Sequence, residues 1–172
     1  MRRKRLTLIF VAIAALSVSA WVGLRPRQGA TVPLPNEFTV TSSGLSEGQC
    51  TWYVVERAKR DNWKIAFDLP YGRHARFWPE RVQGVKLVQI PTAGAIMVLG
   101  AWPGNEYGHV AYIESVQDLS HFTISHANMT AGQSVSLLNG HEIREADVAL
   151  TGHSVLFEGS KEDFPLIGFL ER

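Results

Sequence analysis

The chain of 172 residues has a single cysteine, Cys50, and this scarcity excludes two classes of protein. One cysteine cannot form a disulfide within the chain, so the fold is not a disulfide scaffold. A zinc centre built from several cysteine thiolates is excluded for the same reason. The His-Glu-x-x-His spacing typical of zinc peptidases does not occur either, and we expect no metal and no other cofactor.

Acidic residues are missing from the first 36 positions, whereas six of the 17 basic residues lie in the first 27. From residue 31 onward the chain has 11 basic and 16 acidic residues, a net charge of −5. The overall charge of +1 is therefore the sum of a basic segment and an acidic domain. Because nucleic-acid-binding proteins usually carry a basic patch, we expect no nucleic-acid partner.

The N-terminal segment has the pattern of an export signal. Basic residues 2–5 precede an apolar run, 6–24. Two interpretations of residues 1–24 stay open. One is a signal peptide cut after Ala20, and the other is an uncleaved signal-anchor helix in the cytoplasmic membrane with its N-terminus inside. Both place the following residues on the periplasmic or extracellular side.

The next residues, 25–43, are rich in proline, glycine, serine and threonine, which is typical of a flexible linker. The remaining stretch, 44–172, is long enough for one domain with a sizeable core, and we expect a monomer.

The only thiol is expected at the start of a helix. Residues 48–60 predict a helix that begins at or just before Cys50. The positive end of the helix dipole and the free amides of the first turn stabilise a thiolate, so we expect the pKa of Cys50 to lie below its ordinary value. The competing interpretation is a small buried hydrophobic residue, as most lone cysteines are.

Two predicted strands, 109–116 and 122–126, bring a base and a third group together. Antiparallel pairing of strands joined by a short turn places His126, or Asn128 just beyond it, near His109. A cysteine nucleophile needs a base, and that base needs a partner that fixes its ring. Cys50, His109 and His126 are therefore the candidate catalytic residues, with Asn128 as the alternative third residue. We predict no catalytic role for the other histidines: His74, His121, His141 and His153.

Four segments, in order, resemble the motifs of CHAP domains, the cysteine- and histidine-dependent amidohydrolases and peptidases. The resemblance covers about residues 44–130 and implies a papain-like α+β fold, in which a Cys-bearing N-terminal helix packs on an antiparallel β-sheet. At one position the chain departs from the family, because His126 stands where a glutamate is common. The four segments are Gly48-Gln49-Cys50-Thr51-Trp52-Tyr53-Val54, Gly72-Arg73-His74-Ala75-Arg76-Phe77-Trp78, Pro91-Thr92-Ala93-Gly94-Ala95-Ile96 and Gly108-His109-Val110-Ala111-Tyr112-Ile113-Glu114.

The resemblance implies hydrolysis of peptidoglycan through a thioester on Cys50. The bond is either the N-acetylmuramoyl–L-alanine amide or a peptide crosslink. The backbone N–H of Cys50, with Gln49 as a candidate second donor, stabilises the oxyanion. Trp52, Trp102 and Tyr107 are candidates for a substrate groove. The alternative is a catalytically impaired, membrane-anchored binding domain, in which the missing glutamate marks lost activity.

Further strands are expected on both sides of this pair. Residues 139–172 match no motif, but their pattern suggests strands that complete the sheet. Besides the pair that carries the histidines, the strand-like segments are 95–99, 135–138, 154–157 and 166–170.

Overall fold

The structure is a computed structural model that describes residues 45–67 and 74–172. The predicted export segment, 1–24, and the predicted linker, 25–43, lie outside the described residues, so both stay predictions. In the part of the chain that is described, no helix is long and apolar enough to cross a membrane. The elements are α1 (Cys50–Arg60), η1 (Ala75–Phe77), α2 (Trp78–Arg81), β1 (Lys86–Val88), β2 (Ile96–Leu99), β3 (His109–Val116), β4 (His121–Ala127), β5 (Gln133–Leu138), β6 (His141–Thr151), β7 (Ser154–Phe157) and β8 (Asp163–Glu171).

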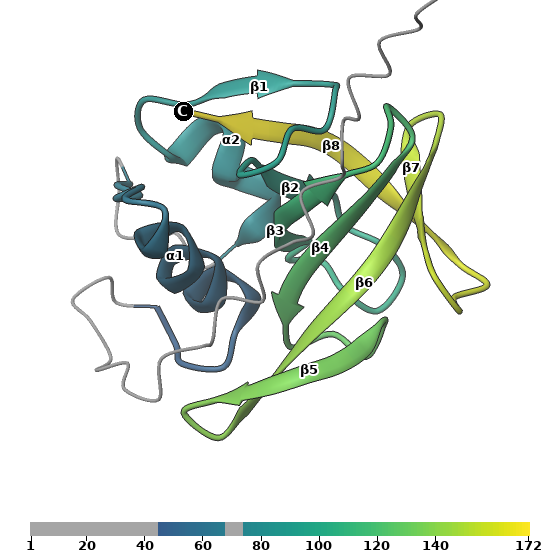
Figure 1. The fold of residues 1–172 in the computed structure, drawn as a ribbon. Coiled ribbons are helices and arrows are strands. Elements are labelled where there is room, and N and C mark those ends of the chain that lie inside the picture. The colour runs from purple at the N-terminus through teal and green to yellow at the C-terminus, as the bar shows by residue number, and fades with distance from the viewer. Residues whose placement is uncertain (1–44, 68–73) are drawn as a thin grey trace, which may run out of the picture.

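Six of the strands close into an antiparallel barrel (Figure 1). The strand order is β8-β2-β3-β4-β6, and β7 pairs with both β6 and β8, which completes the ring. Strand β1 adds to β8 and strand β5 adds to β6, so these two lie outside the ring. The helix α1 packs on the outer face of the barrel, over β3 and β4.

Alternate residues of β3 contribute to two separate cores. Ala111 and Ile113 point into the barrel, where they join aromatic side chains such as Phe122. Val110 and Tyr112 point outward and join the side chains of α1. Successive residues of a strand face opposite sides of the sheet, and both sides of β3 are covered, so five consecutive residues from its start are buried.

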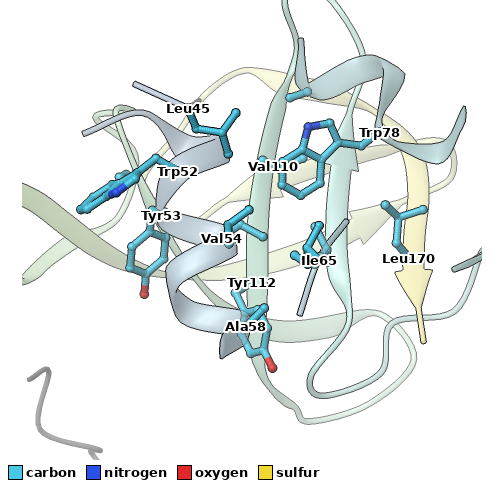
Figure 2. Close-up of a cluster of buried hydrophobic side chains, with 14 of the residues drawn as sticks. Leu45, Trp52, Tyr53, Val54, Ala58, Ile65, Trp78, Val110, Tyr112 and Leu170 are labelled. Carbon is cyan, nitrogen blue, oxygen red and sulfur yellow. The ribbon is translucent and has the colours of Figure 1, made fainter. Parts of the chain in front are cut away.

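The helix α1 begins at Cys50, as predicted, and buries one broad face (Figure 2). Trp52, Tyr53, Val54 and Ala58 are all at most 1 % exposed and pack in the core between helix and barrel. Basic residues occupy the last turn, where the negative end of the helix dipole stabilises them. The predicted arrangement of a Cys-bearing helix on an antiparallel sheet is confirmed, although the sheet makes up most of the fold; the papain-like comparison stays a prediction.

The expected strands are present, with bounds that differ by a few residues, but the longest strand was not predicted individually. Strand β6 has 11 residues and pairs with β4 along seven of them. Charged side chains on its exposed face interrupt the apolar run. The sequence signal that could have located it is the dipeptide Asn139-Gly140 before it, because Asn-Gly is typical of tight hairpin turns. Both residues have positive φ in the structure, 49° and 79°, as such a turn requires.

Candidate active site

The single thiol of the chain, on Cys50, lies at the first turn of α1, beside the start of β3. The Cys50 side chain is partly buried, and its sulfur lies within hydrogen-bonding reach of the backbone N–H of Val110, the residue after His109. Gly48, two residues earlier, has a φ of 81°, and a Cβ there would lie 2.4 Å from Nδ1 of His141. The turn into the helix therefore depends on glycine, which lets His141 of β6 pack closely against it.

The turn before β3 also requires a glycine. Gly108 has a φ of 73°, and a Cβ on it would lie 2.4 Å from the carbonyl oxygen of Leu99. The side chain of Asn105 donates a hydrogen bond to the Gly108 carbonyl at 3.2 Å, which holds this turn. His109 consequently starts the strand at the mouth of the barrel, where its side chain is 2 % exposed.

The two histidines are in contact, as the hairpin geometry predicts. Nε2 of His109 lies 3.2 Å from Nδ1 of His126, and Nε2 of His126 lies 3.1 Å from the carbonyl oxygen of Ala131. A carbonyl only accepts hydrogen bonds, so Nε2 of His126 carries its proton and Nδ1 keeps its lone pair. His109 therefore donates from Nε2 to His126, and its Nδ1 keeps a lone pair that can accept a proton.

Burial keeps both rings neutral. Loss of solvent lowers the pKa of His126 to about 4, and the hydrogen bond to Ala131 opposes this only in part. Loss of solvent also lowers the pKa of His109 well below its ordinary 6.5, and His126 lowers it further. The low dielectric of the barrel interior disfavours an imidazolium in either ring.

Burial likewise reverses the prediction made for the thiol. It raises the pKa of Cys50 above its ordinary 9.0, although the backbone amides of Val110, Thr51 and Cys50 itself act in the opposite direction. A buried thiolate loses more solvation than the amides at the helix start return. Cys50 therefore rests as a neutral thiol and His109 as a neutral imidazole, rather than as a thiolate and an imidazolium.

A cleft of about 390 Å³ opens over these groups. Gln49 and Asn128 both border it, and Nδ2 of Asn128 donates a hydrogen bond to Oε1 of Gln49 at 2.8 Å. In the described part of the chain, no three histidine, cysteine, aspartate or glutamate side chains are grouped to hold a metal ion. The cleft is lined by Ser46, Gln49, Cys50, Thr51, His74, Ala75, Asn105, Tyr107, Gly108, His109 and Asn128.

Two of the three predicted groove aromatics are elsewhere. Trp52 is 1 % exposed and packs beneath α1, with its ring centroid 6.0 Å from that of His141, so the prediction for Trp52 is wrong. Trp102 packs edge-on against Phe164 at 5.1 Å, which corrects its prediction too. A large apolar ring gains more from these cores than from a wet cleft. Tyr107 does line the cleft and is 51 % exposed.

The cleft also includes residues for which the sequence predicts no role, and His74 is the one among them with an imidazole side chain. His74 lines the same cleft as Cys50, and its ring meets that of Tyr107 edge-on at 4.8 Å. The sequence predicts no catalytic role for it. The available signal was its place directly before Ala75, inside one of the four segments that resemble the family.

Buried and partly buried hydrogen bonds fix α1 against the strands that carry the histidines. Glu114, at a bulge of β3, accepts two hydrogen bonds from Arg57, one from Nε at 2.9 Å and one from Nη2 at 2.7 Å. The hydroxyl of Ser125 on β4 also donates to Glu114, and it accepts a hydrogen bond from Tyr53 at 2.8 Å. The paired, charge-assisted bonds tie one helix to two strands, so Cys50 keeps its place relative to His109 and His126.

Comparison with protein families decides what kind of domain this is. The family described as the CHAP domain matches residues 40–128, which include Cys50, His109 and His126. The chain belongs to the CHAP domain family. The match covers just over half of the chain and ends at Asn128, one residue after β4, so β5 to β8 lie beyond it.

Two curated relatives of this CHAP domain come from Staphylococcus aureus. One is named probable autolysin SsaALP and is 36% identical over 87 residues, which make up 49% of this chain and 31% of the relative. The other, an N-acetylmuramoyl-L-alanine amidase domain-containing protein, is 34% identical over 87 residues, 48% of this chain and 14% of the relative. The chain thus spans less than a third of either. The solved structure of Ly7917 aligns with a TM-score of 0.48 and 20% identity, covering 76% of this chain and 56% of that one.

Proposed function

We propose that this CHAP domain is a peptidoglycan hydrolase that cleaves an amide bond through a thioester on Cys50. The observation that carries the proposal is the hydrogen-bonded series from the Ala131 carbonyl through His126 to His109, which ends at the cleft that Cys50 lines. This series leaves Nδ1 of His109 with a lone pair that can accept a proton, and His109 and Cys50 line the same cleft, as a cysteine nucleophile and its base would. The names of the two staphylococcal relatives support the choice of substrate.

The proposed reaction begins with the neutral pair. The thiol of Cys50 gives its proton to Nδ1 of His109 as the sulfur attacks the carbonyl carbon of the amide. The tetrahedral oxyanion is stabilised by the backbone N–H of Cys50, which has no partner within the helix because it lies in the first turn. His109 then protonates the leaving amine, the carbon–nitrogen bond breaks, and a thioester remains.

The second half of the reaction repeats these roles. Water attacks the thioester carbonyl and gives a proton to Nδ1 of His109. The carbon–sulfur bond breaks, and the proton returns to the sulfur of Cys50. His126 stabilises the transient imidazolium less than a carboxylate does, because it is a neutral acceptor. Its hydrogen bond to His109 still fixes the orientation of that ring, which is the other task of the third residue in such a site.

Two finer points belong to the same proposal. The domain acts outside the cytoplasmic membrane, because residues 1–24 have the pattern of an export signal and peptidoglycan lies there. The favoured bond is the N-acetylmuramoyl–L-alanine amide, for which one of the relatives is named, and a peptide crosslink is the second candidate.

Mass spectrometry of muropeptides tests the proposal. Purified protein is incubated with peptidoglycan, and the new termini identify the broken bond. Cys50→Ala is expected to abolish cleavage while the melting temperature stays within a few degrees of wild type. His109→Ala is expected to abolish cleavage in protein that circular dichroism shows to be folded. His153→Ala changes an exposed histidine outside the cleft and serves as the matched control. Cleavage that survives in Cys50→Ala contradicts the mechanism, and wild-type protein that binds peptidoglycan without cleaving it indicates the impaired binding domain instead.

A further inference from the structure

The hydrogen bond between Asn128 and Gln49 joins residues 79 apart in sequence at the edge of the cleft. Gln49 is the residue immediately before α1, and its side chain makes no capping bond to the helix. Asn128 follows β4 directly and lies two residues after His126. The bond therefore connects the start of the cysteine helix with the end of the strand that carries the third histidine.

The backbone conformation of Asn128 is suited to this arrangement. Its φ is 59°, in the left-handed region that few residues other than glycine and asparagine adopt readily. The chain thus turns out of β4 at a position suited to asparagine, and the side chain extends to Gln49 rather than to His109, whose Nε2 already donates to His126.

The direction of the bond decides which end of Gln49 remains for the cleft. Nδ2 of Asn128 donates and Oε1 of Gln49 accepts. The remaining polar group of Gln49 is its NH₂, a donor. An amide that rotates freely presents oxygen as readily as nitrogen, and an oxygen facing a developing oxyanion repels it. Occupying Oε1 removes the repulsive orientation.

We propose that Asn128 is a positioning residue that holds the amide of Gln49 with its NH₂ toward the cleft, where it donates to the oxyanion beside the backbone N–H of Cys50. His126 and Asn128, which the sequence offers as alternatives for the third catalytic residue, then have separate roles. His126 orients the base, and Asn128 orients the second oxyanion donor. This inference rests on the proposed hydrolase function.

Substitutions that invert or remove the amide test the proposal. Asn128→Asp replaces the donor with an acceptor, so Gln49 turns its NH₂ toward residue 128 and its oxygen toward the cleft. On a soluble muropeptide, kcat is expected to fall about tenfold or more with KM nearly unchanged, because the interaction forms in the transition state. Gln49→Glu keeps an acceptor for Asn128 but removes the donor, and it is expected to lower kcat by at least as much.

A double-mutant cycle separates coupling from two independent effects. Gln49→Ala is expected to lower kcat about 10- to 100-fold, and Asn128→Ala about two- to tenfold. If Asn128 acts through Gln49, the double variant is no slower than Gln49→Ala alone. Multiplying effects overturn the proposal, and so does wild-type kcat in Asn128→Asp. The matched control is Asn62→Asp, an exposed asparagine with a φ of 58° at the other end of α1, which is expected to leave kcat unchanged.

A measurement without turnover distinguishes this inference from the proposed function. In ¹⁵N-labelled protein, the side-chain amide resonance of Asn128 is expected to shift on Gln49→Ala and to stay in place on Asn62→Asp. An unmoved resonance overturns the hydrogen bond, whatever the activity. Wild-type protein without hydrolysis refutes the proposed function, and with it the catalytic role of the bond, even where the resonance shifts.

Discussion

The neutral histidine pair predicts that acid destabilises this protein more steeply than its surface charges alone would. His126 is fully buried, and its pKa of about 4 compares with an ordinary value of 6.5. Below pH 6.5 the unfolded chain binds a proton on each of these histidines, whereas the fold keeps them neutral. Protons therefore favour the unfolded state, and the free energy of unfolding falls as the pH falls through this range.

The size of the effect follows from the two pKa values of His126. The pKa of His126 is 6.5 in the unfolded chain and about 4 in the fold, and each pKa unit corresponds to about 1.4 kcal/mol. The free energy of unfolding therefore falls by about 3 kcal/mol between pH 6.5 and 4. Within the interval the slope approaches 1.4 kcal/mol for each pH unit. His109 contributes in the same direction, because burial and His126 both lower its pKa. A loss of this size is a large share of the stability of a typical domain.

Urea unfolding between pH 7 and 4.5 measures this slope. His126→Gln removes one titrating group and also relieves the effect of His126 on His109, so the curve for this variant is expected to be flatter than wild type by at least 1 kcal/mol for each pH unit. His153→Gln, at an exposed histidine, is the matched control and is expected to parallel wild type. The reasoning is refuted if His126→Gln and wild type lose stability in parallel, whatever their absolute stabilities.

Two further predictions concern the thiol and the turn before β3. The rate of Cys50 alkylation by iodoacetamide is expected to rise with a midpoint above pH 9.0, because burial raises the pKa of this thiol. A midpoint below pH 9.0 in folded protein would show that the helix start outweighs burial. Gly108→Ala is expected to lower the free energy of unfolding by about 3 kcal/mol or more, because φ is 73° and the new Cβ meets the Leu99 carbonyl at 2.4 Å. Gly104→Ala, with φ of 89° and no atom within 4 Å of the new Cβ, is expected to cost only about 1 kcal/mol in the same urea titration, and equal losses would contradict the role of the contact.

Local patterns were enough to bring the central residues of the candidate site together. The start of a helix at Cys50 follows from short-range signals, and a short turn between two strands leaves antiparallel pairing as the simplest arrangement. That pairing brings His126 to His109, and the structure places their ring nitrogens 3.2 Å apart. These features depend on neighbours close in sequence.

The closure of the barrel depends on contacts that no local pattern contains. Strand β7 joins β6 on one side and β8 on the other, and this ring encloses the aromatic core. His126 packs there with its ring 5.8 Å from that of Phe157, which comes from β7. The loss of solvent around a side chain depends on atoms from every strand that surrounds it. The position of a histidine within one strand therefore cannot determine its pKa.

The sequence by itself thus determined which residues are present, the helix that carries the thiol and the hairpin that pairs the histidines, because these follow from spacing along the chain. Only the tertiary structure decided the protonation states of Cys50 and His109, the placement of Trp52 in the core and the partner of Asn128. Each of these depends on which surfaces meet in space. The place of the single cysteine at a helix start predicts a thiolate. Its burial against the core between α1 and the barrel raises its pKa instead, so it rests as a neutral thiol.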